Sequence, residues 1–202
     1  RERHVQVLRT GRVRRDVRQV DVRARHAGQL DLRLLGSFLQ ALHGHAVARE
    51  VDAFALLELL HEVVGDALVN AGFDVIESAT NHIDDYGYDY MAQTLNYWKT
   101  SHPDVPVLGI HETEEDANSV KVREVNGIKI SFLDYTYGTN NSGAGEGKEY
   151  MIDIFEKDKV ASMIQKAKEN SDVLIFVAHW GKEMEPMPTE YEKEWATFLM
   201  QQ

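Results

Sequence analysis

The chain has 202 residues, 43% of them hydrophobic, and a net charge of −11. This length and composition suit one main domain with a core, and the acidic balance argues against a general nucleic-acid binder. The sequence has no cysteine, which excludes a disulfide framework and a thiolate metal site. It also contains no run of 18 apolar residues and no apolar stretch typical of a signal peptide.

The composition changes abruptly near Asn70. Residues 1–70 contain eleven Arg and no Lys, Ile, Met, Pro, Tyr or Trp, whereas residues 71–202 contain ten Lys and one Arg. The first part has 11 basic against 9 acidic residues and the second has 11 against 24. The sequence therefore indicates an atypical Arg-rich segment over residues 1–60 and a separate domain over residues 61–202.

Two interpretations of the Arg-rich segment stay open. In the first, it is disordered or is the product of DNA read in a wrong frame, and residues 1–50 pack poorly against the rest. In the second, it is a genuine basic arm, whose nine Arg in the first 25 residues bind phosphate or another anionic surface. Its interspersed valines, such as Val5 and Val7, would then favour a strand.

The first predicted elements follow from hydrophobic periodicity. Residues 51–69 form a wide apolar helical face, and Gly72 suits the position just past the end of that helix. Residues 73–78 read as a short buried strand, and residues 85–99 as a helix with Met91, Leu95 and Trp98 at helical spacing. Two prolines then lead into a short extended segment at residues 107–108.

The second half contains the clearest local signal. Asn126-Gly127 separates two β-rich runs, residues 120–125 and 128–133, and is typical of a two-residue hairpin turn. After a Gly-rich loop, the pattern predicts a helix at residues 158–170, a fully buried strand at 172–178 and a helix at 189–200. Helices alternating with strands, plus a hairpin, indicate an α/β sandwich with a mixed sheet.

Two motifs place an imidazole just after a predicted buried strand. One contains Asn81, His82 and Asp85, and the other contains His179 and Glu183. Strand ends are where α/β proteins assemble catalytic sites, and these residue types suit a two-metal hydrolase. We therefore expect Asn81, His82 and His179 to meet at one edge of the sheet.

Simpler interpretations exist for each motif. Asn81 can be a helix N-cap, with Asp84 or Asp85 favouring the helix dipole, although this does not explain His82. His179 can merely bond a neighbouring loop, and the adjacent Trp180 is expected to pack.

Other polar residues give weaker signals. Asp134 follows a predicted strand and could face the same edge or cap the following turn. His102 and His111 fall in loops with no evident partners. Residues 143–147 are Gly-rich but lack the context of a phosphate loop, so we interpret them as a flexible loop.

Three blocks of the sequence resemble the bacterial poly-γ-glutamate capsule-synthesis (CapA/PgsA-type) family over roughly residues 62–202. They are NAGFDVIESATNHIDDYGYDYMAQTLNYW, VNGIKISFLDYTYGTN and DVLIFVAHWGKEMEPMPTEYEKEWATFLMQQ. The family's Asn-His-x-x-Asp-x-Gly pattern matches from Asn81 to Gly87, with Thr80 in place of a first Asn. Its His-Trp-Gly-x-Glu pattern matches from His179 to Glu183.

The family is similar to calcineurin-like metallophosphoesterases, so the resemblance implies a mixed sheet flanked by helices. The family's opening Gly-Asp and Asn-Leu-Glu motifs do not occur in residues 1–60, and its Gly-x-His-Pro-His motif does not occur before Gln202. The resemblance therefore implies a partial sandwich, truncated at both ends, that retains about half of a dinuclear site.

The resemblance also implies roles for individual residues. Asn81 and His179 would be metal ligands for a divalent cation of the Mn, Zn or Fe class, in an incomplete site. His82, Asp85 and Glu183 would be catalytic, with His82 donating to the leaving group or to transition-state charge.

The implied function is the synthesis or export of poly-γ-glutamate or a related anionic polymer. The expected partners are an anionic polymer or a phosphoryl or amide substrate, and other capsule-synthesis proteins, with no nucleic acid. The parent protein would act at the cell surface, joined to the membrane through an anchor outside this chain. The alternatives are a non-catalytic scaffold in the capsule machinery and a basic-arm module that binds anionic polymer.

Overall fold

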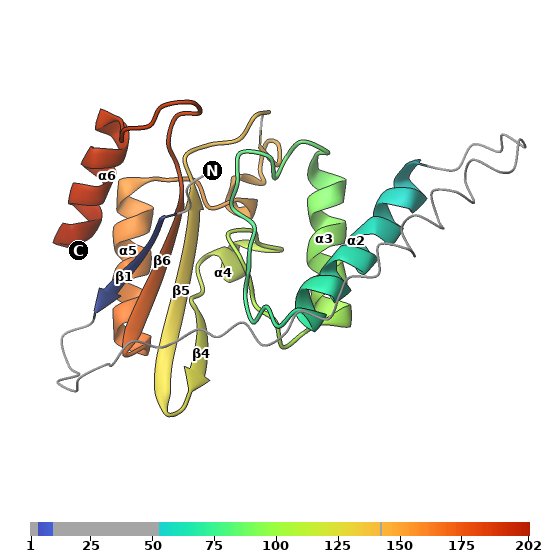
Figure 1. Ribbon diagram of the computed structural model, residues 1–202, viewed down its shortest axis with the longest axis horizontal. Coiled ribbons are helices and arrows are strands. Elements are labelled where there is room, and N and C mark those ends of the chain that lie inside the picture. Colours follow the sequence, from blue (N-terminus) through green and yellow to red (C-terminus); the bar gives the residue numbers. More distant parts are fainter. Residues whose placement is uncertain (1–3, 10–52, 142) are drawn as a thin grey trace, which may run out of the picture.

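The computed structural model describes residues 4–9, 53–141 and 143–202 (Figure 1). The elements are, in chain order, β1 (His4–Arg9), α2 (Ala53–Asn70), β2 (Ile76–Glu77), α3 (Tyr88–Ser101), β3 (Val107–Leu108), α4 (Glu114–Ala117), β4 (Lys121–Val125), β5 (Ile128–Thr136), the 3₁₀ helix η1 (Glu149–Met151), α5 (Lys157–Asn170), β6 (Val173–His179) and α6 (Glu190–Gln201). The predicted α/β class, with a mixed sheet flanked by helices, is confirmed.

The described strands form two small sheets. The larger has the order β1-β6-β5-β4, with β5 and β6 parallel and the other two pairs antiparallel. The smaller sheet pairs β2 and β3 in parallel. Since β5 and β6 are parallel and joined through α5, their carboxyl ends lie at one edge of the sheet.

The predicted hairpin between β4 and β5 is confirmed. Asn126 and Gly127 have φ angles of 55° and 79°, the left-handed values that a two-residue type I′ turn requires at both central positions. The register then pairs Val125 with Ile128 and continues to Lys121 opposite Phe132. A local turn signal thus fixes the alignment of two strands.

The larger core lies between β5, β6 and the helices α5 and α6, which lie together on the left of Figure 1. Its buried side chains include Tyr135, Phe176, Ile164 and Trp195. Tyr135 and Phe176 stack with ring centroids 5.5 Å apart, which joins neighbouring strands on one face. β5 and β6 are rich in apolar residues because α5 and α6 cover them and because both are inner strands of the sheet.

The start and end of α6 follow its sequence. Thr189 accepts a hydrogen bond from the backbone N–H of Glu192, and the Glu192 side chain accepts one from the backbone N–H of Thr189. This capping box satisfies two backbone donors at the start of the helix. Trp195 and Leu199 are buried, as the predicted inward face requires, and Phe198 packs at the margin.

The helix α2 ends as predicted. The backbone N–H groups of Gly72 and Phe73 donate to the carbonyls of Val69 and Leu68, and Gly72 has φ 88°. This is the Schellman arrangement that Gly favours just beyond a helix.

The prediction that a helix begins at Asp85 is wrong. α3 begins at Tyr88, with Gly87 at its N-cap position, because residues 81–86 form successive turns. The backbone N–H groups of Ile83, Asp85 and Gly87 each donate to the carbonyl three residues earlier. Asn81 is therefore not a helix N-cap, and the simpler interpretation of that residue fails.

The strand β1 is the part of residues 1–50 that the structure describes, and the expectation that residues 1–50 pack poorly stays a prediction. Its six residues pair antiparallel with β6, from His4 opposite Ala178 to Arg9 opposite Val173. One edge of β6 pairs with β5. The backbone N–H and C=O groups on its other edge need partners, and β1 supplies them. Residues 10–52 lie outside the described part of the chain, and the two interpretations of the Arg-rich segment remain predictions.

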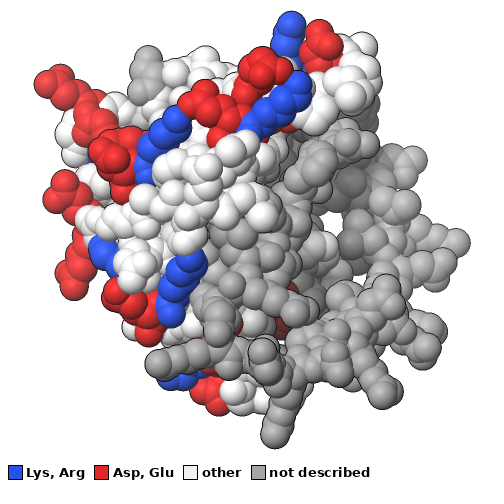
Figure 2. Space-filling model, turned by 90° about the vertical axis from the view of Figure 1, so that its left-hand side faces the viewer, with Lys and Arg blue, Asp and Glu red and all other residues white. Residues whose placement is uncertain are grey.

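Charges are interspersed on the face around α6, which Figure 2 shows. Neighbours on this helix such as Lys193 and Glu190 form an ion pair at 2.7 Å. Exposed pairs of this kind are hydrated and contribute little to stability. None of the described helices is long and apolar enough to cross a membrane.

Candidate functional site

The loops that follow β2, β5 and β6 converge at the upper edge of Figure 1. His179 is the last residue of β6 and pairs with Thr136 at the end of β5. Asn81 lies in the turns after β2, and Asn140 in the loop after β5. The backbone N–H of Asn140 donates to the carbonyl of Asn81 at 2.8 Å, which joins two of these loops.

The structure brings Asn81 and His179 into direct contact. The Nε2 of His179 lies 2.9 Å from the Oδ1 of Asn81, although the residues are 98 positions apart. Ligands that each lie about 2.1 Å from one ion at roughly a right angle are themselves about 3 Å apart. The 2.9 Å separation is that of a hydrogen bond, and it also equals the spacing of two such ligands.

His82 and Asp85 form a second pair beside the first. The Nδ1 of His82 lies 2.7 Å from the Oδ2 of Asp85. The His82 hydrogen bond, followed by one from Asn140, holds the pKa of Asp85 below its ordinary value. Asp85 is thus ionised at neutral pH, so His82 donates from Nδ1 and keeps Nε2 for other contacts.

Asn140 links the two pairs. Its Oδ1 accepts from the Nδ2 of Asn81 at 2.9 Å, and its Nδ2 donates to the Oδ1 of Asp85 at 3.2 Å. The same Nδ2 lies 2.9 Å from the Nδ1 of His82. The N–H groups of Asn140 and His82 therefore lie side by side, and both donate to the Asp85 carboxylate. Asn140 was not predicted from the sequence, although its position just after a strand is the signal that singled out Asn81 and His179.

Asp84 anchors the loop that carries Asn140. Its buried Oδ2 accepts from the backbone N–H of Gly143 at 2.8 Å, and its carbonyl accepts from the Asn141 side chain at 3.1 Å. Asp84 therefore acts in loop packing, not in a helix dipole.

Asp134 has neither of its predicted positions. It is 1% exposed within β5, and its Oδ2 accepts the backbone N–H groups of Ser78 and Ala79, each at 3.0 Å. Burial raises the pKa of Asp134 to about 7, in spite of these two hydrogen bonds. Asp134 fixes the segment that leads into Asn81, and so positions the site from below.

The remaining residues of the second motif separate. Trp180 stacks on Phe155 with centroids 5.6 Å apart and packs against the core, as expected. Glu183 is exposed in the loop before α6, and within the described residues it forms no hydrogen bond or ion pair. The structure thus groups Asn81, His82, Asp85 and His179, but does not bring Glu183 to them.

The described residues fit only part of a metal site. Asn81 and His179 offer two suitable atoms, but no group of three or more His, Asp or Glu side chains in the described part of the chain is arranged to hold an ion. Two cations about 3.5–4 Å apart need several more ligands. Among the described residues, Asn81 and His179 could therefore serve at most as two ligands of a single ion.

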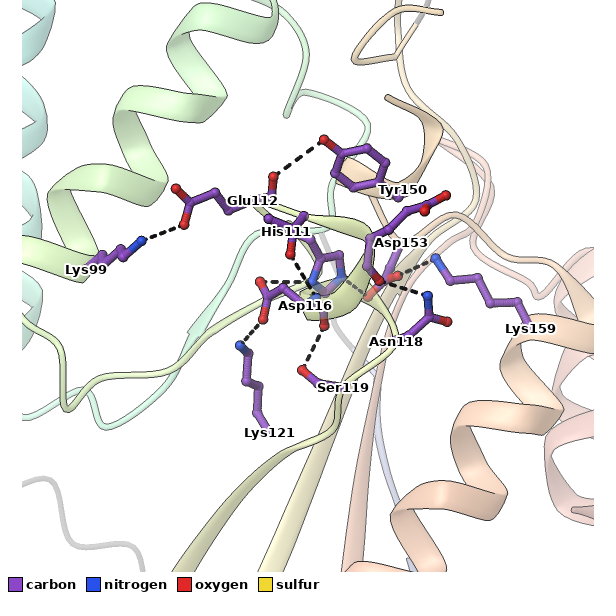
Figure 3. Close-up of polar contacts among 12 residues, drawn as sticks. Lys99, His111, Glu112, Asp116, Asn118, Ser119, Lys121, Tyr150, Asp153 and Lys159 are labelled. Atoms are coloured by element: carbon purple, nitrogen blue, oxygen red, sulfur yellow. Dashed lines mark hydrogen bonds and ion pairs between the residues drawn. The ribbon is translucent and has the colours of Figure 1, made fainter. Parts of the chain in front are cut away.

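A second polar cluster was missed by sequence reasoning (Figure 3). His111 is 5% exposed, and its Nε2 lies 2.7 Å from the Oδ2 of Asp153. Its Nδ1 lies 3.6 Å from the Oδ2 of Asp116, an ion-pair distance. Lys159 pairs with Asp153 at 2.8 Å and Lys121 with Asp116 at 2.5 Å. The expectation that His111 lacks partners is wrong.

The charges of this cluster support one another. Burial lowers the pKa of His111, but the carboxylates of Asp116 and Asp153 raise it by more, so the net shift is upward. The nearby His111 and then Lys121 hold the pKa of Asp116 far below its ordinary range. The cluster therefore joins α4, β4, α5 and the segment after β3.

His102 likewise has partners. Its Nε2 lies 2.7 Å from the Oδ1 of Asp66 and 3.1 Å from the Tyr97 hydroxyl. These contacts join the end of α3 to α2.

A groove of about 650 Å³ lies away from the strand-end residues. Its lining includes Trp98, Pro106, Asp116, Lys121 and Arg123, and therefore borders the His111 cluster. The strand-end site lies outside this groove.

The comparisons with known proteins cover the part of the chain that contains the strand-end motifs. The sequence profile described as "Bacterial capsule synthesis protein PGA_cap" matches residues 49–202. A second profile, described as "NAD-specific glutamate dehydrogenase", matches residues 1–85, which is under half of the chain. The two matches overlap at residues 49–85, where the change in composition near Asn70 also falls.

Two curated relatives support the first profile. The chain is 29% identical over 139 residues to "Capsule biosynthesis protein CapA" of Bacillus anthracis, covering 66% of this chain and 33% of that protein. It is 26% identical over 129 residues to "PGA biosynthesis protein CapA" of Bacillus subtilis (strain 168), covering 64% of this chain and 34% of that protein. The chain thus spans about a third of each relative's length. With a profile match over most of its residues, the chain belongs to the bacterial capsule synthesis protein family.

Proposed function

We propose that the chain carries part of a metallophosphoesterase-like site that serves the synthesis or export of poly-γ-glutamate or a related anionic polymer. In this proposal the sheet and its helices are part of a calcineurin-like sandwich. The parent protein works at the cell surface with other capsule-synthesis proteins, on a substrate with phosphoryl or amide groups.

The main support is the contact between Asn81 and His179 at 2.9 Å, at the carboxyl ends of two strands. Both residues belong to family motifs, and an amide oxygen and an imidazole nitrogen suit Mn, Zn or Fe. Asn81 and His179 would hold the ion, and a bound divalent cation would supply Lewis-acid polarisation of the substrate oxygen.

His82 and Asp85 have separate roles in this proposal. Asp85 accepts from the Nδ1 of His82 and so orients the ring. With both ring nitrogens protonated and Nδ1–H held by Asp85, the Nε2–H of His82 can deliver its proton to a leaving group beside the ion. Glu183 would contribute to substrate recognition or acid–base catalysis once its exposed loop closes over the site.

Titration of the chain with Mn²⁺ tests the ligand assignment. We expect weak binding of a single ion, since two protein ligands and water make a poor cage. Asn81→Ala and His179→Ala should each reduce affinity by at least about tenfold, because the loss of even an outer partner of a ligand costs that much. His102→Ala is the matched histidine control and should bind as the parent does. Unchanged binding by both site variants would contradict the assignment.

We also expect the chain to hydrolyse bis-p-nitrophenyl phosphate at or near the background rate, with Mn²⁺ or Zn²⁺ added. A single loosely held ion cannot clamp both the attacking and the leaving oxygen. Robust turnover that is lost in His82→Ala and in His179→Ala would show that the site needs fewer ligands than we propose.

The same assays separate the catalytic proposal from a scaffold role. A scaffold that keeps its histidines for folding would bind no Mn²⁺, and His179→Ala would lower its melting temperature instead. The basic-arm alternative predicts polymer binding that weakens with salt and is lost when residues 1–25 are removed.

A further inference from the structure

The side chain of Asn140 contacts both pairs of the strand-end site. Its backbone N–H donates to the carbonyl of Asn81 at 2.8 Å, and the next turn of its loop is held by Asp84 through Gly143. These anchors do not involve the Asn140 side chain. A substitution at this position therefore changes the side-chain contacts while the loop keeps its attachment.

One half of the Asn140 amide determines the orientation of Asn81. The Nδ2 of Asn81 donates to the Oδ1 of Asn140, which leaves the Oδ1 of Asn81 facing the Nε2 of His179. If the Asn81 amide turned over, two amide oxygens would face each other and an NH₂ group would face His179. An NH₂ group cannot ligate a cation, so this orientation decides whether Asn81 can serve as a ligand.

The other half of the Asn140 amide holds Asp85. The Nδ2 of Asn140 donates to one carboxylate oxygen at 3.2 Å, while the other oxygen accepts from His82 at 2.7 Å. Asp85 is about one third exposed, with a side-chain accessibility of 36%. Without a second donor it would be free to rotate away from His82 into water.

We propose that Asn140 is a positioning residue, which turns the Asn81 oxygen toward the ion position and keeps Asp85 on His82. Since Oδ1 must accept on one side and Nδ2 must donate on the other, a single amide orientation serves both pairs. The inference rests on the proposed function for the ion position, whereas the contact to Asp85 stands without it.

Two substitutions separate the halves of this role. Asn140→Ala removes both contacts, whereas Asn140→Asp keeps an oxygen that accepts from Asn81. We expect Asn140→Ala to lower Mn²⁺ affinity at least about tenfold, the usual effect of losing an outer partner, and Asn140→Asp to restore most of that loss. Asn141→Ala, in the same loop, removes a side chain that donates to the Asp84 carbonyl; it is the control and should bind as the parent does.

A second measurement is independent of any metal. Nitrogen NMR of the neutral His82 ring, recorded at alkaline pH, reports which ring nitrogen carries the proton. We expect the Nδ1–H form to dominate in the parent and in Asn141→Ala. Asn140→Ala should shift His82 toward the Nε2–H form that free histidine prefers, with an unchanged melting temperature.

The outcomes separate the metal proposal from the positioning role of Asn140. If the parent binds no Mn²⁺ but Asn140→Ala still shifts the His82 tautomer, the metal proposal fails and the positioning role of Asn140 toward Asp85 stands. If Asn140→Ala changes neither the affinity nor the tautomer, the positioning role is overturned. An affinity loss that Asn140→Asp does not restore would overturn the assigned effect on Asn81.

Discussion

Gly109→Ala is expected to destabilise the fold by about 3–5 kcal/mol, a large part of the stability of a typical domain. A Cβ at this position would lie 2.4 Å from the Cβ of Ala79, and 2.7 Å from both the Ala79 nitrogen and the Oδ2 of Asp134. Gly109 also has φ +78°, which an L side chain rarely adopts. Backbone strain and overlap each cost about 1–3 kcal/mol, and here they act together.

Gly72→Ala is the matched control for Gly109→Ala. Gly72 has φ +88°, and a Cβ there would meet nothing within 4 Å. It should therefore cost only about 1 kcal/mol, the conformational part of the effect. Urea unfolding of both variants gives the comparison. Equal losses would mean that the close approach of Gly109 to Ala79 and Asp134 is absent in solution.

The Gly109 substitution should also disturb the strand-end site. Ser78 and Ala79 donate to Asp134 and lead directly into Asn81. Displacing Ala79 would therefore move Asn81 away from His179. In the folded fraction of Gly109→Ala, Mn²⁺ affinity should fall as far as in Asn81→Ala.

His111→Gln is expected to cost about 2–3 kcal/mol at pH 6 and less at pH 9. It removes a buried imidazole from between Asp116 and Asp153, and leaves each carboxylate with one lysine, Lys121 or Lys159. Loss of one partner of a buried pair is strongly destabilising, and the remaining lysines reduce the effect.

The direction of the pH effect follows from linkage. The folded-state pKa of His111 lies above its ordinary value of 6.5, so His111 binds its proton more tightly in the folded chain. Its contribution is complete below about pH 6.5 and is lost as pH rises through the folded pKa. The stability difference between the parent and His111→Gln should thus shrink with rising pH.

Two other groups titrate, and their effects on stability must be separated from that of His111. Asp134, whose pKa is about 7, makes the folded chain less stable as pH rises from about 4 to 7. Asp116, with a lowered pKa, loses its contribution only at acid pH. The Asp134 effect is common to the parent and His111→Gln. The Asp116 effect is confined to acid pH, so the difference between the two curves above the acid range isolates His111. A difference that is independent of pH would contradict the buried charged cluster.

The fold was predictable wherever the information is local. The Asn126-Gly127 turn, the buried run of β6 and the periodicity of α5 and α6 each depend on neighbouring residues, and each is confirmed. The start of α3 was misplaced because the turns at residues 81–86 depend on bonds to a distant loop, such as those of Asp84 to Gly143.

The site was predictable in its motifs but not in its connections. Asn81 and His179 could be singled out because each follows a buried strand. Asn140 lies 58 positions from His82, and His111 lies 42 positions from Asp153. No periodicity or spacing rule relates residues that far apart, so Asn140 was overlooked and His111 was assigned no partner.

The separation of Asn81 and His179 along the chain has a consequence for the order of folding. The β4–β5 hairpin closes through a two-residue turn, an event of about 1–10 μs. The contact between Asn81 and His179 closes a loop of 98 positions and requires β2, β5 and β6 to be in place. Contacts of such long range form late, because they reward the chain only after the loop-closure entropy has been overcome. A probe that binds across Asn81 and His179 would therefore report the last stage of folding, well after the hairpin has formed.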